Sequence, residues 1–337
     1  MRGTYTESRF SQEKNNGSEQ FQAMVCESPG NFTPGRALLR RPSFSEAVIR
    51  LEGCGVCASN LPVFEGRPWF SYPLEPGAPG HEGWGVVQEI GEGVENVSPG
   101  DRVAFLSGNA FAEYETVSVS QIATLPAGLA GKPFPGEPLG CAVNVFRRCP
   151  VQKGERVAVV GTGFMGVLLV KLCALAGADV IALSRRPYSL EMARQFGASH
   201  TVRMDDHWKT VEQVKGLTSK EGCSKVFEAS GYQWPLDLAT EITSTRGTLV
   251  IAGYHQDNPR SVNMQQWNWK GLDVINAHER DNDVYMEGIR GAIDMVSRGE
   301  LDPSPLYTHV FPLSELNEAF STLRMRPDSF MKALVTV

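Results

Sequence analysis

The chain has 337 residues, long enough for two domains, and its 42% hydrophobic and 21% charged residues are ordinary proportions for a globular protein. A net charge of -6, with both signs mixed along the chain, argues against a nucleic acid or an anionic membrane surface as the main partner. The seven cysteines are scattered and odd in number, which predicts reduced thiols and a cytoplasmic location rather than a disulfide framework.

The first part of the chain is predicted to be mostly β. Residues 1–20 are polar and lack the apolar core of a secretory signal, so we expect a disordered tail. Short strands then alternate with glycine-rich turns; examples are Ala47–Leu51, Gly85–Ile90 and Arg102–Phe105. A linker rich in Pro and Gly follows over Pro126–Pro138.

From Val157 the pattern changes to alternating strands and helices, which predicts a doubly wound parallel sheet. The six expected strands are Val157–Val160, Val180–Ser184, Thr201–Met204, Lys225–Ala229, Thr248–Ala252 and Leu272–Asn276. Helices are expected at Phe164–Ala176, Leu236–Ile242 and Val284–Ser297. The apolar, β-like segment Phe330–Val337 is expected to return and pair with the first domain.

Three glycines, Gly161, Gly163 and Gly166, follow the first of these strands and open the first helix. In such a turn the first glycine bends the chain, the second lets the backbone approach a pyrophosphate, and the third lets helix and strand pack closely. We therefore predict that a dinucleotide binds here, with Phe164 and Met165 at the helix start. The alternative is a glycine-rich turn that binds nothing.

Several side chains in the first half are candidate metal ligands. Cys57 and His81 suit Zn²⁺, and a catalytic site needs about three protein ligands and one open position. Glu82 and Glu137 are the carboxylate candidates, and Cys141 shares a face with Glu137 if a helix begins there. Each residue taken alone has an ordinary structural explanation. Cys57 belongs to a single C-x-x-C, which does not make a closed zinc site.

Three ordered segments, Gly55–Asn60, Pro79–Gly83 and Val97–Val103, together with the glycine turn, resemble the zinc-type alcohol dehydrogenases of the medium-chain dehydrogenase/reductase superfamily. The resemblance runs from about Gln22 to Val337. It implies a GroES-like catalytic domain over residues 21–135 and 285–337, and a Rossmann domain over residues 136–284. The active site is then expected in the cleft between them, and the assembly is expected to be a homodimer or a homotetramer.

The resemblance also implies roles for individual residues. Cys57 and His81 fall on the family's metal ligands, and Glu82 on the acidic neighbour that ligates or approaches the metal. Glu137 resembles the glutamate that is the third ligand in sorbitol-dehydrogenase-type members, with Cys141 as the alternative. Ser59 matches the hydroxyl that passes the substrate's proton.

The chain departs from the family pattern at three points. Asn60 stands where many members have an Asp beside the metal-binding histidine; it can still accept a hydrogen bond but carries no charge. Pro62 stands where a relay histidine is common. The four-cysteine lobe of the structural zinc is missing, so one zinc per chain is expected.

The second Rossmann strand bears on the choice of cofactor. An acidic residue at its end commonly binds the ribose 2′-hydroxyl of NAD. Here Ser184 occupies this position, and Arg185 and Arg186 follow, whose guanidinium groups suit a phosphate. We therefore predict NADP(H) in preference to NAD(H). The alternative is that both arginines form the solvated start of a helix at Pro187.

The sequence gives less information about the substrate than about the metal or the cofactor. Aromatic and polar residues suited to a polyhydroxylated substrate occur in two regions that can border the cleft; they are Trp69, Phe70 and Tyr72, and then Trp267–Trp269 and His278–Arg280. The alternative is that the tryptophans belong to the core or to a dimer interface. We expect a zinc-dependent enzyme that interconverts a secondary alcohol and a ketone of a sugar, polyol or cyclitol. A zinc-independent quinone or enoyl reductase and a non-catalytic nucleotide-binding protein remain the alternatives.

Overall fold

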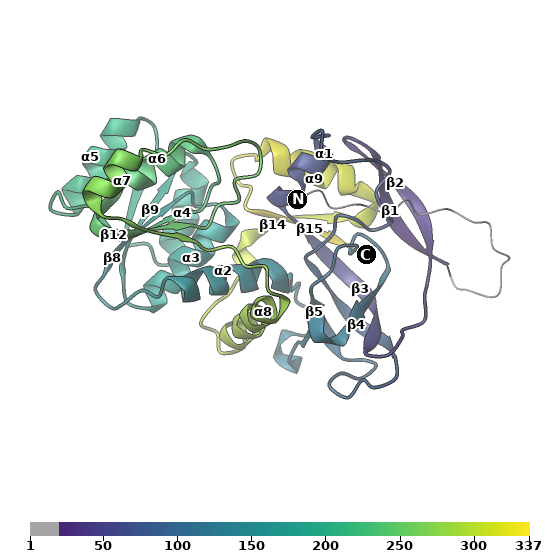
Figure 1. Cartoon of the computed structure of the whole chain (residues 1–337). Helices are drawn as coiled ribbons and strands as arrows, with labels where there is room; N and C mark the ends of the chain where they lie inside the picture. Colours follow the sequence, from purple (N-terminus) through teal and green to yellow (C-terminus); the bar gives the residue numbers. More distant parts are fainter. Residues whose placement is uncertain (1–19) are drawn as a thin grey trace.

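The computed structural model describes residues 20–337 and contains two large β-sheets that lie side by side (Figure 1). The predicted tail lies outside the described residues except for Gln20, which begins strand β1. None of the seven cysteines, all of which lie within residues 20–337, is paired in a disulfide. Within residues 20–337, none of the helices has the length and apolar character needed to cross a membrane.

The first sheet has the strand order β14-β15-β3-β4-β5-β7, with β6 paired to β3. Most side chains of its central strands are buried, and the predicted strands at Ala47, Gly85 and Arg102 are confirmed within β3, β4 and β5. A separate hairpin of β1 and β2 lies beside it. The strands of this part are β1 (Gln20–Ser28), β2 (Asn31–Leu38), β3 (Glu46–Val56), β4 (Gly83–Ile90), β5 (Arg102–Phe105), β6 (Tyr114–Ser118) and β7 (Ile122–Thr124).

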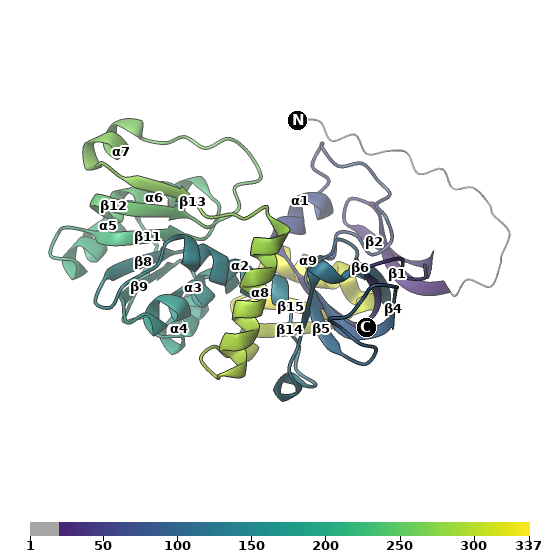
Figure 2. The ribbon, with the colours of Figure 1, turned by 60° about the horizontal axis from the view of Figure 1, so that its bottom comes forward.

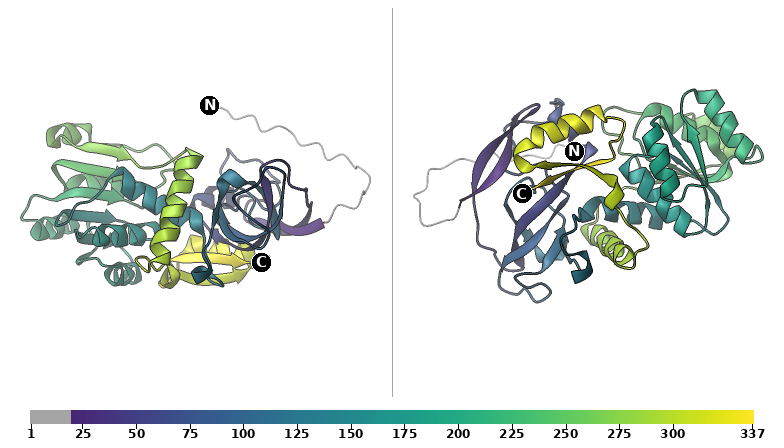
Figure 3. Two further views of the ribbon diagram at one scale, coloured as in Figure 1. Left: turned by 90° about the horizontal axis from the view of Figure 1, so that it is seen from below. Right: turned by 180° about the vertical axis from the view of Figure 1, so that it is seen from behind.

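The end of the chain completes the first sheet, as predicted for Phe330–Val337. Strand β15 (Lys332–Thr336) pairs antiparallel with β3 and parallel with β14 (Tyr307–Pro312). In the right-hand view of Figure 3, the yellow C-terminal strands lie against the purple and blue strands of this sheet. Helices α1 (Leu61–Phe64) and α9 (Leu316–Met325) pack nearby, where Phe64 and Phe320 stack at 5.0 Å between ring centroids.

The second sheet is parallel and has the order β10-β9-β8-β11-β12-β13. In chain order this is 3-2-1-4-5-6, the arrangement of a Rossmann fold, in which ligands bind beyond the carboxyl ends of the strands. All six predicted strands are confirmed, with ends that differ by a few residues. They are β8 (Arg156–Val160), β9 (Asp179–Ser184), β10 (His200–Arg203), β11 (Cys223–Glu228), β12 (Thr243–Ile251) and β13 (Asp273–Asn276).

Helices cover both faces of this parallel sheet. Buried residues of α2, α3, α4 and α8 form one apolar cluster with it, and those of α5 and α6 form another on the opposite face. The helices predicted at Phe164, Leu236 and Val284 are confirmed as α3, α6 and α8. The helices of this part are α2 (Gly136–Arg148), α3 (Phe164–Leu175), α4 (Pro187–Gln195), α5 (His207–Leu217), α6 (Gln233–Ile242), α7 (Met264–Lys270) and α8 (Asn282–Ser297).

Helices α2 and α8 pack on each other where the two sheets meet, and α8 crosses this region in Figure 2. The contact is close because a Cβ atom at Gly140 would lie 2.7 Å from Ile289. Asn144 Nδ2 also donates a hydrogen bond to the carbonyl of Val284 at 2.9 Å. This packing fixes the first turns of α2, which face the first sheet. The domain boundaries at residues 136 and 285 stay a prediction.

Candidate active site

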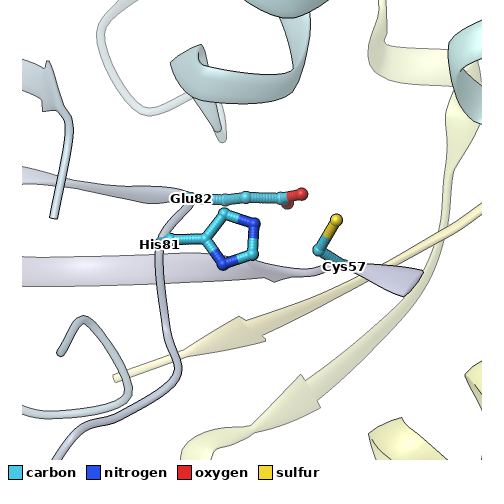
Figure 4. A group of neighbouring side chains, drawn as sticks. All are labelled: Cys57, His81 and Glu82. Atoms are coloured by element: carbon cyan, nitrogen blue, oxygen red, sulfur yellow. The ribbon is translucent and has the colours of Figure 1, made fainter. Parts of the chain in front are cut away.

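Cys57, His81 and Glu82 converge at one end of the first sheet (Figure 4). Cys57 directly follows β3, and His81 and Glu82 directly precede β4. Because Cys54 of β3 pairs with Gly83 of β4, the end of one strand lies beside the start of the other. One ligand atom from each of the three residues lies within 4.8 Å of the others. The sequence had predicted this group.

The orientation of His81 is set by its own loop. Its Nδ1 lies 3.1 Å from the carbonyl oxygen of Pro79, which can only accept, so we assign the proton to Nδ1. The Nε2 atom is then the one free to bind an electrophile. Asn60 Nδ2 donates to the same carbonyl at 2.9 Å and lies 3.4 Å from the ring Nδ1. The sequence had suggested that Asn60 accepts a hydrogen bond. In the structure it instead donates to the carbonyl that orients the histidine.

Glu82 is fully buried and forms an ion pair with Lys332 of β15. Its Oε1 accepts a hydrogen bond from Lys332 Nζ at 2.6 Å, and Oε2 lies 2.5 Å from the same nitrogen. Within residues 20–337 no donor reaches Oε2 in hydrogen-bond geometry, although the Lys332 ammonium neutralises both carboxylate oxygens. Room for this carboxylate exists because residue 55 is glycine: a Cβ there would lie 1.7 Å from Oε2.

Glu137 and Cys141 approach this group from the first turns of α2. The predicted shared helix face is confirmed, because Cys141 Sγ donates to Glu137 Oε1 at 3.1 Å. Burial raises the pKa of Glu137, against the opposing charge of His81. Burial and the charge of Glu137 also raise the pKa of the Cys141 thiol. Neither residue belongs to the compact group of three found among the described residues.

The electrostatics of the site favour a cation. Burial alone would lower the pKa of His81, but the hydrogen bond and charge of Cys57, with the charges of Glu137 and Glu82, raise it to about 10. Without an ion the ring therefore carries a second proton, whose place at Nε2 a metal ion would take. Burial would likewise lower the pKa of Lys332, yet the charges of Glu82 and Cys57 raise it. A thiolate, an imidazole nitrogen and a carboxylate oxygen form a donor set that suits Zn²⁺.

Ser59 lies beside the same group, in the short 3₁₀ turn that follows Cys57. Its hydroxyl donates to Cys57 Sγ at 3.2 Å. The predicted neighbourhood of Ser59, Cys57 and His81 is therefore present in the structure.

A pocket of about 570 Å³ opens next to this group. His81 and Glu137 lie on its wall, and Ser107, Glu115 and Tyr285 line the remainder with other residues. Sequence reasoning missed these last three. Glu115 lies in β6 (Tyr114–Ser118), which matched no motif in the sequence, and α8, which carries Tyr285, was expected only to lead into the C-terminal part of the chain.

The aromatic residues that the sequence offered for substrate recognition do not line this pocket. Trp267 packs on the core of the parallel sheet, and its Nε1 donates to Thr240 Oγ1 at 3.1 Å. Trp269 is 89% exposed, and Trp69 is 56% exposed. Trp267 is therefore a core residue, which was the alternative to a role in substrate recognition.

The glycine turn after β8 has the geometry that its sequence predicted. Gly161 has φ of +95°, a conformation that favours glycine, and a Cβ at Gly166 would lie 2.0 Å from the Gly161 carbonyl oxygen. A Cβ at Gly163 would meet no described atom within 4 Å, so packing within the described chain gives no reason for this glycine. No side chain caps the start of α3, which leaves its N–H groups free to face an anion.

The three residues predicted to select the cofactor do not share one environment. Ser184 is buried at the end of β9, and its hydroxyl accepts from the backbone N–H of Arg186 at 3.3 Å. The Arg186 guanidinium is turned to the start of β15, where it donates to the Phe330 carbonyl at 2.6 Å. Arg185 is exposed. The Arg186 guanidinium is therefore engaged within the protein, and the Arg185 guanidinium is the one that is free to bind a phosphate.

The family models agree with this architecture. Residues 43–130 match the alcohol dehydrogenase GroES-like domain, and residues 165–297 match the zinc-binding dehydrogenase family. The chain belongs to the zinc-type alcohol dehydrogenases of the medium-chain dehydrogenase/reductase superfamily. It is thus an oxidoreductase that acts on alcohols, built from a GroES-like and a Rossmann domain.

Similar proteins span nearly the whole chain. It is 27% identical to the 2-dehydro-3-deoxy-L-galactonate 5-dehydrogenase of Pseudoalteromonas atlantica, over 90% of this chain and 95% of that protein. It is also 27% identical to the D-xylulose reductase of Saccharomyces cerevisiae, over 93% of this chain and 97% of that protein. Among solved structures, one described as a zinc-binding dehydrogenase from Sinorhizobium meliloti 1021, bound to NADP, has a TM-score of 0.81 at 25% identity and covers 95% of this chain and 100% of that one.

Proposed function

We propose that this dehydrogenase depends on one zinc ion per chain and interconverts a secondary alcohol and a ketone of a sugar, polyol or cyclitol with NADP(H). The observation that carries the proposal is the convergence of Cys57, His81 and Glu82, with one ligand atom from each within 4.8 Å of the others, beside the pocket. Bound Zn²⁺ supplies a Lewis acid that lowers the pKa of the substrate hydroxyl. Bound nicotinamide supplies the hydride chemistry.

The chain's own residues have distinct parts in this proposal. Cys57, through Sγ, and His81, through Nε2, would hold the ion, and the Glu82 carboxylate would hold or approach it. The third ligand comes from α2, where Glu137 and Cys141 are the candidates. Ser59 Oγ lies 3.2 Å from Cys57 Sγ and is suited to take the proton of the substrate hydroxyl. Because Pro62 occupies the place of a relay histidine, the proton leaves Ser59 by another route.

For the cofactor, the uncapped start of α3 and the open position at Gly163 support a pyrophosphate. The neutral Ser184 removes the charge that would repel a 2′-phosphate, and the exposed Arg185 is the guanidinium available to bind it. Arg186 supports the junction with β15 through its bond to the Phe330 carbonyl. We therefore assign preference for NADP(H) to Ser184 and Arg185.

The substrate class rests on two observations of different kinds. Two similar proteins carry names that refer to sugar derivatives, one to a neutral xylulose and the other to a sugar acid, a deoxy-galactonate. The pocket beside His81 is lined by several polar side chains, which suits a substrate with several hydroxyl groups. The unpaired cysteines support a cytoplasmic enzyme, and a homodimer or homotetramer is the assembly we expect.

One experiment separates this function from the alternatives. Zinc content is measured by mass spectrometry on the purified protein, and polyols, cyclitols and alkanols are screened for reduction of NADP and NAD. We expect about one zinc per chain and turnover of a polyol or cyclitol that is lost when zinc is chelated. Full activity in a metal-free preparation, with a quinone or an enoyl compound as substrate, would establish the zinc-independent reductase instead. Cofactor binding without any turnover would indicate a non-catalytic protein.

A further inference from the structure

Glu115 places a carboxylate on the wall of the pocket that also contains His81 and Glu137. It lies on β6, opposite Ile49 of β3, so the paired strands fix its position. Its Oε1 accepts a hydrogen bond from the backbone N–H of Asn109 at 3.2 Å. Its Oε2 is buried and has no hydrogen-bond partner within residues 20–337.

A buried acceptor without a partner is costly, and each such atom needs an explanation. Burial raises the pKa of Glu115 to about 7, although the hydroxyl of Ser107 and the nearby backbone N–H groups favour its charged form. The Asn109 N–H engages Oε1 only, and no cation is among the groups that shift the pKa of Glu115, so within residues 20–337 Oε2 has neither a charged nor a hydrogen-bonding partner. A donor that enters the pocket would complete the hydrogen bonding of Oε2.

The charge of the pocket restricts the kind of molecule that can supply this hydrogen-bond donor. The lining contains the acidic residues Glu46, Glu115 and Glu137, and none of the described lining residues is Lys or Arg. Glu46 is paired with Arg40 at 2.7 Å, and Glu137 faces His81 at the candidate metal site. Glu115 is thus the acidic side chain on this wall that has neither a cation nor a metal-site role. A substrate carboxylate would meet repulsion there.

We propose that Glu115 determines substrate specificity by accepting a hydrogen bond, through Oε2, from a hydroxyl group of the substrate that is distant from the reacting carbon. The substrate is then a neutral polyhydroxylated alcohol and not a sugar acid. This inference rests on the proposed function and refines its substrate class, since the hydroxyl must belong to a molecule whose reacting carbon lies at the candidate metal site.

The test uses the zinc-loaded full-length enzyme and substrates that share one ring. Cyclohexanol carries only the reacting hydroxyl, myo-inositol carries hydroxyls on every ring carbon, trans-4-aminocyclohexanol adds an amine, and 4-hydroxycyclohexanecarboxylate adds an acid. For Glu115→Ala we expect kcat/KM for myo-inositol to fall about 10- to 100-fold, because a hydrogen bond to a charged group is lost. We expect kcat/KM for cyclohexanol to change less than about threefold. Glu115→Gln should raise kcat/KM for the acid. The matched control is Glu46→Ala, which removes an acid on the same wall that already has a partner.

The outcomes separate the two proposals. A wild-type enzyme that oxidises none of these alcohols with either cofactor contradicts the proposed function, and this inference with it. If the wild type is active and Glu115→Ala reduces cyclohexanol and myo-inositol equally, or neither, the proposed function stands and this inference is wrong. If the wild type has a higher kcat/KM for trans-4-aminocyclohexanol than for myo-inositol, the site accepts an ammonium group, and this inference is also wrong. Zinc content and melting temperature of each variant exclude misfolding as the cause.

Discussion

Replacement of Lys332 by Met tests how strongly the candidate site depends on the end of the chain. Lys332 and Glu82 have side chains that are 6% and 0% exposed, and their charges lie 2.6 Å apart. The substitution keeps the volume of the side chain and removes its charge. Glu82 loses the cation that it contacts, and the ammonium group that lay over the ring of Phe164, 5.1 Å from its centroid, is lost.

The expected loss of stability follows from the burial of both charges. At the effective dielectric constant of about 20 that suits proteins, the attraction at this distance is about 6 kcal/mol, and the desolvation of the two ions offsets most of it. Removing one partner leaves the desolvation of the other uncompensated, which costs about 3–5 kcal/mol. Replacing both, as Glu82→Leu with Lys332→Met, removes both charges, so we expect a stability within about 2 kcal/mol of the wild type.

The assay is urea unfolding at pH 7 with EDTA present, because zinc at Glu82 would mask the effect. Circular dichroism and tryptophan fluorescence are followed together, since coincident transitions are needed before a free energy is extracted from a two-domain chain. The wild type, both single variants and the double variant form a double-mutant cycle. A loss below about 1 kcal/mol for Lys332→Met, or a double variant no more stable than the single ones, would refute the reasoning.

Three further predictions address the metal, the cofactor and pH. Cys57→Ser should lose most of its zinc and nearly all turnover while its circular dichroism spectrum is unchanged; retained turnover without metal contradicts the role of Cys57. Ser184→Asp with Arg185→Ala should shift the NADP/NAD ratio of kcat/KM toward NAD by about 10- to 100-fold, as for loss of a hydrogen bond to a phosphate. The pKa of Glu115 is raised from 4.5 to about 7 in the folded protein, so its ionisation destabilises the fold as pH rises from 4.5 through 7. Glu115→Gln should therefore gain stability over the wild type across this range, by at most about 3 kcal/mol, and urea unfolding at pH 5 and pH 8 measures it; equal differences at both pH values would count against the raised pKa.

Local sequence patterns were sufficient for much of the fold. The six strands of the parallel sheet were readable because each is a short apolar run bounded by turn residues, and the glycine turn because its spacing has a steric cause. Cys57, His81 and Glu82 were recognised through the resemblance of Gly55–Asn60 and Pro79–Gly83 to the family's motifs, because each residue alone has an ordinary structural explanation. These features depend on short stretches of chain.

Other features depend on where distant segments meet, and the sequence alone does not determine this. Lys332 appeared only as one polar residue in an apolar strand; its partner became known from the pairing of β15 with β3. Arg186 was predicted beside a phosphate, but its side chain reaches the Phe330 carbonyl. Trp267 lies near a strand end as expected, yet its ring is turned to the core. Position along the chain did not predict the direction of a side chain.

The position of Glu82 depends both on local sequence and on where distant segments meet. The pairing of β3 with β4 sets it beside Cys57, the absence of a side chain at Gly55 leaves space for its carboxylate, and the return of β15 supplies Lys332. Lys332 neutralises this carboxylate, and one carboxylate oxygen lies within 4.8 Å of a ligand atom of Cys57 and of His81. The candidate metal site is therefore complete only when the last strand is in place. Loss of the C-terminal strand should disturb this site as well as the sheet, because the same ion pair serves both.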